Sequence, residues 1–166
     1  MEILEAIRTR RSIRKYKRDP VPEEELEKIL DAGRWAPSAS NSQPWKFIVL
    51  RDAEVRESVA QLLPVGKFLA GAPLGIAVVS DPRLSSRAVE DGSLATYSML
   101  LAAHALGLGT CWLAPSFNEN KLKELLGIPQ EARLISVISV GYPDEARSMT
   151  RKELEDITFT NRYGNK

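Results

Sequence analysis

The 166-residue sequence is poor in residues that bind metals or form disulfides, with one cysteine, Cys111, and one histidine, His104. A single cysteine cannot form an intramolecular disulfide, so the cysteine content gives no sign of export to an oxidising compartment. One cysteine and one histidine also fall short of the four ligands of a structural zinc site. A His/Cys zinc cluster within one chain is therefore excluded, and we predict no metal site.

Long apolar runs and net charge are lacking as well. The longest mainly apolar stretch, Met99 to Leu108, is far shorter than the roughly 20 residues of a membrane helix. The first residues do not combine a basic region with an apolar stretch, so they do not resemble a signal peptide. The formal net charge of +1 creates no overall attraction to nucleic acid or to an anionic membrane. We expect a cytoplasmic protein that uses neither as a partner.

The pattern of apolar residues predicts an α+β fold in one domain, residues 1–166. With 43% hydrophobic and 27% charged residues, the composition is that of a globular protein. Apolar periodicity predicts helices at 2–9, 22–35, 52–63, 90–106, 118–126 and 151–157, and strands at 46–50, 74–80, 110–113 and 134–140. Helices followed by alternating strands and helices are typical of a central mixed β-sheet flanked by helices.

Three local features carry further expectations. Asn118 is a candidate side-chain cap for the helix that follows it, and Thr150 is a candidate cap for the last helix. Residues 64–73 contain two glycines and are expected to form a mobile connection. Residues 99–108 are apolar nearly all round, which predicts a central buried helix in which His104 is a structural residue.

Seven basic residues and no acidic residue lie between positions 8 and 18: Arg8, Arg10, Arg11, Arg14, Lys15, Lys17 and Arg18. The rest of the chain is therefore net −6, since +1 minus +7 is −6. Arginine forks match phosphate oxygens and Ser12 adds a neutral donor, so the cluster points to a bound phosphate. A solvated surface arm and a nucleic-acid-binding arm are the alternatives. Ile13 and Tyr16 interleave with the basic residues as if docked on a core, which argues against a nucleic-acid arm.

Two further segments can contact a ligand. The stretch from Ala36 to Trp45 brackets hydroxyls and amides between prolines, and such a loop can present donors and acceptors to a planar heterocycle. The alternative is a generic polar turn. Gly107 and Gly109 lead into a strand whose end can offer backbone N–H groups to a ligand edge. For the two glycines taken alone, an ordinary helix-to-strand turn is the favoured explanation. The chain has no Gly-x-Gly-x-x-Gly, P-loop or Gly-x-Ser-x-Gly motif.

Taken together, these segments resemble the nitroreductase superfamily of FMN enzymes. The resemblance runs from Glu2 to about Gly164. It is carried by Arg10-Arg11-Ser12-Ile13-Arg14, Ala36-Pro37-Ser38 through Gln43-Pro44-Trp45, the stretch from Ala102 to Trp112, Gly141-Tyr142-Pro143, and Arg151 ahead of Leu154-Glu155. It implies a nitroreductase-like α+β homodimer with two FMN sites at the subunit interface.

The resemblance also implies which residues bind the cofactor. The segment of Arg10, Arg11, Ser12 and Arg14 matches the one that holds the FMN phosphate, ribityl chain and pyrimidine edge. The loop that approaches the flavin from the partner subunit corresponds to Pro37, Ser38, Ala39, Ser40, Asn41 and Gln43. The strand end along the isoalloxazine ring corresponds to Trp112, Leu113 and Ala114. Arg151 matches a second phosphate-binding cation; a lysine often stands two residues earlier, where this chain has Met149, and Arg147 is a candidate substitute.

The activity implied by the resemblance is ping-pong electron transfer from NAD(P)H to nitroaromatic, quinone or similar acceptors. Because the flavin carries the hard chemistry, no side-chain acid or base is assigned. The short connection from Gln61 to Pro73 predicts an open, permissive site. It argues against a halotyrosine deiodinase, because the resemblance implies that such an enzyme holds its substrate under a longer lid. The alternatives are a flavin-binding protein that fragments or stores FMN, and a non-enzymatic nucleic-acid module.

Overall fold

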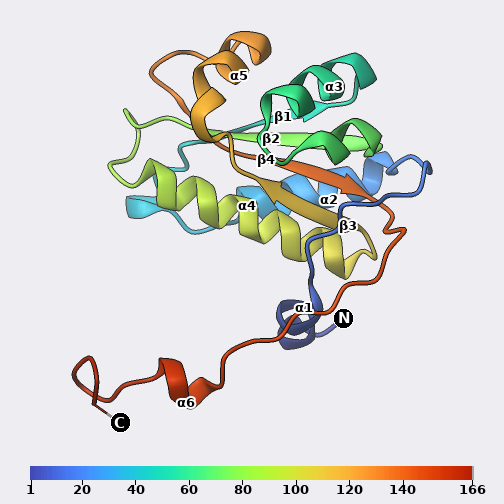
Figure 1. The fold of residues 1–166 in the computed structure, drawn as a ribbon. Coiled ribbons are helices and arrows are strands. Elements are labelled where there is room, and N and C mark those ends of the chain that lie inside the picture. Colours follow the sequence, from blue (N-terminus) through green and yellow to red (C-terminus); the bar gives the residue numbers. More distant parts are fainter. Residues whose placement is uncertain (166) are drawn as a thin grey trace.

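The computed structural model describes residues 1–165 and has helices on both faces of a β-sheet (Figure 1). Its helices are α1 (Ile3–Thr9), α2 (Glu23–Arg34), α3 (Ala53–Leu62), α4 (Ala88–Ala105), α5 (Glu119–Leu126) and α6 (Leu154–Ile157). Its strands are β1 (Trp45–Leu50), β2 (Leu74–Ser80), β3 (Gly109–Leu113) and β4 (Arg133–Gly141), and short 3₁₀ helices are η1 (Ala39–Asn41), η2 (Lys67–Gly71) and η3 (Ser116–Asn118). The predicted α+β class is confirmed. That residues 1–166 form one domain stays a prediction.

The sheet has the order β1-β2-β4-β3, and each neighbouring pair of strands is antiparallel. The expected mixed sheet is therefore wrong for these four strands. Within residues 1–165, parallel pairing enters through the isolated bridge between Ser12 and Thr110. The apolar run of β2 misled the prediction, because a strand buried on both faces reads alike in parallel and antiparallel sheets.

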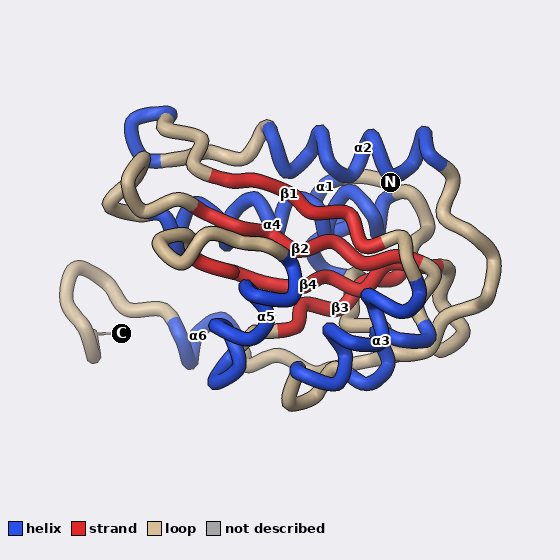
Figure 2. Tube along the Cα trace, turned by 90° about the horizontal axis from the view of Figure 1, so that it is seen from above, coloured by secondary structure: helices blue, strands red, loops and turns tan. Residues whose placement is uncertain are grey.

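Both faces of the sheet are covered, and β2 shows how. Leu74, Ile76 and Val78 pack with α2 and α4 on one face, whereas Ala77 and Val79 pack with α3 and α5 on the other. Successive side chains of a strand point to opposite faces, so a strand between two helical layers is apolar at every position. Figure 2 shows the strands from above with helices on both sides.

The layer of α2 and α4 contains the predicted central helix. Leu26 and Ile29 of α2 and Met99 of α4 are buried in one cluster with the sheet. A Cβ atom on Gly33 would lie 2.9 Å from Met99 Cγ, so the glycine lets the two helices approach. Truncating such a buried side chain to alanine costs about 2–5 kcal/mol of folding free energy.

The layer of α3 and α5 departs from one sequence-based prediction. Asp52 caps α3 by accepting hydrogen bonds from the amides of Glu54 (2.8 Å) and Val55 (3.1 Å). Asn118 does not cap α5 with its side chain, so that prediction is wrong; its Nδ2 donates instead to the carbonyl of Leu62, at 2.7 Å. The reason is local: a 3₁₀ turn precedes α5, and the backbone of Asn118 lacks the extended conformation of a capping residue.

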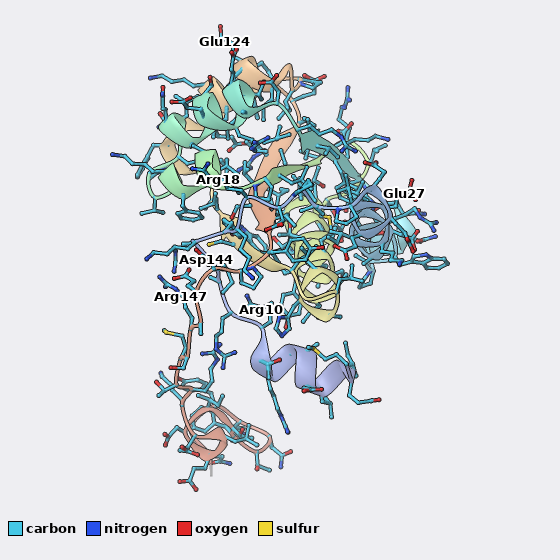
Figure 3. The ribbon with its side chains drawn as sticks, turned by 90° about the vertical axis from the view of Figure 1, so that its right-hand side faces the viewer. Arg10, Arg18, Glu27, Glu124, Asp144 and Arg147 are labelled. Carbon is cyan, nitrogen blue, oxygen red and sulfur yellow. The ribbon has the colours of Figure 1, made fainter. Side chains whose placement is uncertain are left out.

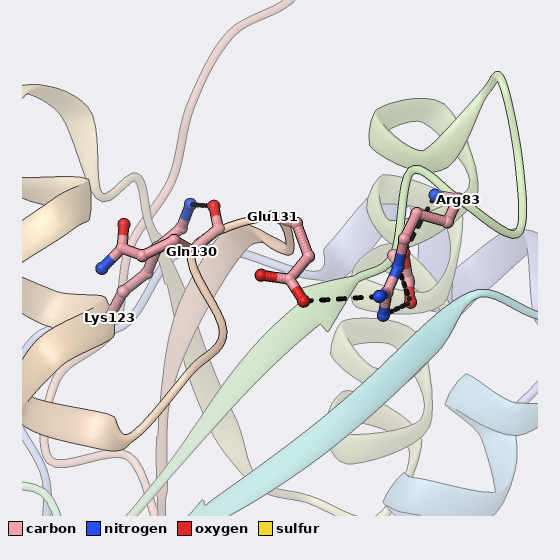
Figure 4. Close-up of polar contacts among 5 residues, drawn as sticks. Arg83, Lys123, Gln130 and Glu131 are labelled. Atoms are coloured by element: carbon pink, nitrogen blue, oxygen red, sulfur yellow. Dashed lines mark hydrogen bonds and ion pairs between the residues drawn. The ribbon is translucent and has the colours of Figure 1, made fainter.

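The connection from α5 to β4 is fixed by charged side chains (Figure 4). The buried Lys123 donates from Nζ to the carbonyl of Gln130, at 3.0 Å. Arg83 pairs with Glu131 at 3.3 Å and with Asp81 at 2.7 Å, which links the turn after β2 to this connection. These contacts fix the turn that follows β2 against the connection that leads into β4.

The connection at residues 64–73 is packed more closely than the sequence predicted. It contains η2, whose Leu69 is fully buried in the core that also includes Val59 and Leu63. Phe68 packs against the same core. The sequence did not predict this packing, because a single buried leucine leaves no periodic pattern over so few residues. The glycines and prolines of the connection indicated mobility instead.

The first helix and the tail after β4 lie outside the two layers (Figure 1). Large apolar side chains are exposed on both, including Ile3 (61%), Leu4 (63%) and Leu154 (75%). The last helix begins at Leu154 rather than at Arg151, and Thr150 does not cap it, so both expectations are wrong. Across residues 1–165, no helix combines the length and apolar character needed to cross a membrane.

Candidate functional site

The arginine segment, residues 10–14, docks on the edge of β3. The amide of Ile13 donates to the carbonyl of Thr110 at 2.9 Å, and Ser12 forms the parallel bridge with Thr110. A Cβ atom on Gly109 would lie 2.8 Å from Ile13 Cγ1, so the glycine makes room for this side chain. Ile13, which lies between basic residues in the sequence, therefore docks on the core, as predicted.

Tyr16 anchors the far end of the segment. Its hydroxyl donates to the carbonyl of Ile13 at 2.5 Å and lies 2.6 Å from Ser139 Oγ. Burial raises the pKa of Tyr16 well above its ordinary value, so the hydroxyl stays protonated and keeps its donor. Backbone pairing and this side chain together fix the course of residues 12–16.

The guanidinium groups of this segment have unfilled hydrogen-bonding capacity. Arg11 Nη1 donates to the carbonyls of Arg8 (2.6 Å) and Arg10 (2.8 Å). Arg10 Nε and Arg11 Nε are buried and have no partner among residues 1–165. Buried donors without an acceptor are costly, and a phosphate is an acceptor that two adjacent arginines can share. The segment therefore fits a bound phosphate.

A hollow of about 330 Å³ opens beside the segment. Its lining includes Arg11, His104, Gly109, Glu145 and Arg147. Figure 3 shows Arg10 and Arg147 on the side of the molecule where α1 and the tail leave the sheet. Arg147 thus lines the same hollow as Arg11, and its role as a substitute for the missing lysine stays a prediction.

Glu145, which the sequence-based analysis missed, already lies among these cations. One oxygen accepts from the amides of Arg14 (2.5 Å) and Lys15 (3.2 Å), and the other is 3.0 Å from Arg147 Nε. The hydrogen bond from the Arg14 amide, more than any other contact, lowers the pKa of Glu145. Glu145 lies two residues after Gly141-Tyr142-Pro143, one of the segments that carry the family resemblance, and this position was the only sequence feature that could have indicated a site residue.

Arg151 does not join this group in one chain. It is exposed in the tail, donates to the carbonyl of Thr150 at 2.9 Å, and does not line the hollow. The proposed second phosphate contact of Arg151 is therefore not formed within the chain as described.

The polar loop at residues 37–43 has a strained backbone. Ser40, Asn41 and Gln43 all have positive φ angles, of 52°, 55° and 48°. Left-handed conformations of residues other than glycine cost of order 1–3 kcal/mol each and concentrate at functional sites. Ser38 Oγ closes the loop by accepting from the amide of Gln43 at 3.0 Å. A generic polar turn would not need three such residues, so the observation favours a functional loop.

The remaining predicted residues lie at the end of β3. Trp112 is half-buried against the α2 and α4 core, Leu113 is buried, and Ala114 is exposed. They follow Thr110 and Cys111 in the chain, so they continue the strand on which the arginine segment docks. Cys111, between Thr110 and Trp112, is buried, and burial raises the pKa of its thiol.

The predicted site residues thus form two groups at opposite ends of α4. The loop is fastened to the first turn, where Asp91 Oδ1 accepts from the Ala39 amide at 3.0 Å. The residue just before the arginine segment is fastened to the last turn, where Thr9 Oγ1 lies 2.8 Å from His104 Nε2. Asp91 and His104 are thirteen residues apart in α4, which corresponds to about 20 Å along the helix.

Residues 7–65 and 63–142 match the family model described as Nitroreductase family. The chain belongs to the nitroreductase family. A protein of Archaeoglobus fulgidus, provisionally named NADH dehydrogenase/NAD(P)H nitroreductase, is 44% identical in an alignment of 153 positions that covers 88% of this chain and 88% of that protein. The family predicted from the residues is confirmed.

Solved structures of other family members have the same fold. An FMN-dependent nitroreductase of Clostridium difficile superposes with a TM-score of 0.89 at 33% identity, over 96% of this chain and 99% of that one. A provisionally named nitroreductase of Desulfovibrio desulfuricans, solved in complex with FMN, gives a TM-score of 0.89 at 33% identity over 98% of both chains. The predicted nitroreductase-like fold is confirmed as well.

Proposed function

We propose that this nitroreductase-family chain is an FMN-dependent enzyme that carries electrons from NAD(P)H to a small acceptor. The proposal is carried by two buried donors, Arg10 Nε and Arg11 Nε, which have no hydrogen-bond partner in the described part of the chain and lie on a segment fixed to β3. The relatives described above are named as NAD(P)H-dependent or FMN-dependent enzymes, or were solved with FMN. The site chemistry and the family therefore point to the same cofactor.

The residues of this chain would divide the work of binding. Arg10, Arg11 and Ser12 would hold the phosphate, with Arg14 toward the ring and Arg147 as the further cation lining the same hollow. Trp112, Leu113 and Ala114 would lie along the ring system. FMN supplies the chemistry by accepting a hydride and releasing electrons to a second substrate. The protein groups would orient the cofactor, which is why no side-chain acid or base is assigned.

We propose that the working unit is a homodimer in which each site uses both chains. Two groups of site residues about 20 Å apart along one helix are hard to unite within a chain but simple to unite across an interface. The large exposed apolar side chains on α1, α4 and the tail support this, because exposed apolar patches mark association surfaces. Arg151 would then contribute from the tail, in a position that the single chain does not provide.

We also propose that nitroaromatics, quinones or similar acceptors use the site in turn with NAD(P)H. The chain has no separate dinucleotide-binding motif, and the connection at residues 64–73 packs onto the core through Leu69. Little of that connection is free to close over a substrate, so selection among acceptors should be weak.

Steady-state kinetics with both substrates varied tests this proposal. If NAD(P)H leaves before the acceptor binds, double-reciprocal plots give parallel lines, and a quinone and a nitroaromatic show broadly similar efficiency. Intersecting lines would mean that donor and acceptor are bound together, and the shared site would be refuted. Tight FMN binding without turnover would instead indicate a role in FMN storage or fragmentation.

A further inference from the structure

Asp91 is a buried acid without an ion pair in the described part of the chain. It lies in the first turn of α4 and is 3% exposed. Ionised carboxylates are almost never buried so deeply unless hydrogen bonds or a helix N-terminus stabilise them. The position of Asp91 at a helix N-terminus is favourable, and its hydrogen bonds show what it holds.

The two oxygens of Asp91 accept from two different segments. Oδ1 accepts from the Ala39 amide at 3.0 Å, and Oδ2 accepts from Ser85 Oγ at 2.6 Å. Ser85 Oγ in turn accepts from the Arg87 amide at 3.0 Å. Ala39 is the first residue of η1, so its amide has no partner within that short helix. One carboxylate thus joins the strained loop to the turn before α4.

The helix end that carries Asp91 cannot easily move. A Cβ atom on the next residue, Gly92, would lie 2.6 Å from Ile135 Cγ1 and 3.3 Å from Ser80 Cβ. The first turn of α4 therefore rests directly on the sheet. A group that is hydrogen-bonded to this turn is therefore held in place by the rigid core of the protein rather than by a surface loop.

We propose that Asp91 is the positioning residue that holds the loop of residues 37–43 in the strained conformation in which it meets the flavin of the partner subunit. This inference rests on the proposed function. Asp91 does not touch the reacting atoms; it acts through the Ala39 amide. The three left-handed residues, Ser40, Asn41 and Gln43, persist because this contact and the Ser38 contact over-determine the loop.

Three variants separate this role from general stability. Asp91→Ala removes both acceptors. Asp91→Asn keeps one oxygen that can accept from the Ala39 amide and should restore the loop. Thr96→Val is the matched control, because Thr96 is a buried polar residue of the same helix whose hydroxyl bonds to Gly92 and Ser136 rather than to the loop.

Two measurements on the purified full chain test the proposal. Hydrogen exchange of the amides of residues 39–43, without FMN, reports on the loop alone. We expect about tenfold faster exchange in Asp91→Ala, and exchange close to wild type in Asp91→Asn and Thr96→Val. Titration with FMN then reports on the cofactor site, and we expect about tenfold weaker binding in Asp91→Ala alone.

The outcomes are distinct. Unchanged exchange in Asp91→Ala, or equal acceleration in Thr96→Val, would overturn the inference. Accelerated exchange with unchanged FMN affinity would also overturn it, because the loop would then be held for another purpose. Should Asp91→Ala fail to fold, Ser85→Ala, which removes one of the two partners of Asp91, replaces it with a smaller effect of the same sign. Wild-type protein that never binds FMN would refute the proposed function, while the exchange data would still report on the contact.

Discussion

Ser12 and Thr110 form a parallel bridge that fastens the arginine segment to the outer edge of β3. The pairing covers part of a sheet edge that would otherwise present unpaired backbone groups. It also sets Arg11 beside Gly109 at the start of β3, where both residues line the hollow. The position of the charge cluster is thus determined by backbone pairing, and Arg10 Nε and Arg11 Nε have no hydrogen-bond partner within residues 1–165.

We predict that Arg11→Ala weakens FMN binding strongly. A charge-assisted hydrogen bond to a partly buried phosphate contributes about 1.5–3 kcal/mol, or roughly ten- to a hundredfold in affinity. Titration of flavin-free protein with FMN measures the effect. Arg18→Ala is the matched control, because Arg18 belongs to the same basic cluster but is exposed and does not line the hollow. Equal affinity for Arg11→Ala and wild type would refute the phosphate assignment.

Glu145 predicts a pH-dependent contribution to stability. Because hydrogen bonding lowers its pKa in the folded protein, the unfolded chain binds more protons, and stability rises with pH across that interval. The contribution is complete above the ordinary carboxyl pKa and is lost as pH falls through the lowered value. The melting temperature of Glu145→Gln should therefore be below wild type near neutral pH, and the difference should close in acid.

A control for this effect lies next to it in sequence. Asp144 is an exposed acid whose side chain forms no hydrogen bond within residues 1–165, so Asp144→Asn should melt like wild type throughout. A difference between Glu145→Gln and wild type that persists unchanged at acid pH would show that the contact does not depend on the charge of Glu145.

The sequence predicted the fold better than the site. Strong periodic signals such as the Pro22–Glu25 helix start and the apolar run of β2 located the elements to within a few residues. Strand direction was predicted wrongly, because burial on both faces hides it. The side-chain cap expected of Asn118 failed because a 3₁₀ turn precedes α5 and gives Asn118 a non-extended backbone, which the apolar pattern does not reveal.

The missed site residues share one cause. Asp91 and Glu145 act on backbone amides that are distant in sequence, 52 residues away at Ala39 and 131 residues away at Arg14. No local motif encodes such contacts. Asp91 is one of two acids in the first turn of α4, and the local sequence does not distinguish it from Glu90. Gly109 makes room for the Ile13 side chain, a role that the sequence analysis did not predict.

Cys111 is predicted to be structural. Burial raises the pKa of its thiol, which lowers the fraction of reactive thiolate at neutral pH. Cys111→Ser should therefore keep most NAD(P)H-dependent turnover, measured per bound FMN. A variant that retains FMN but loses turnover would show that the thiol takes part in the reaction.

The flavin-loaded protein is predicted to be a dimer, with a mass of about 37 kDa, twice the 18.5 kDa of one chain. Leu154 is 75% exposed on the tail, and Leu154→Lys should weaken association in light-scattering measurements. Val65 is similarly exposed but lies between α3 and η2, which pack on the face of the sheet opposite α4, so Val65→Lys is the control and should leave the dimer intact. A monomer that binds FMN tightly would contradict a site shared between chains.

The central claim is that this chain passes electrons from NAD(P)H through bound FMN, and anaerobic titration of the flavin-loaded protein tests it most directly. We predict that stoichiometric NADH or NADPH bleaches the yellow flavin absorbance, and that adding a quinone restores it. The Arg11→Ala variant should show the same bleaching only when excess FMN keeps its site filled. A bound flavin that neither NADH nor NADPH bleaches would contradict the account.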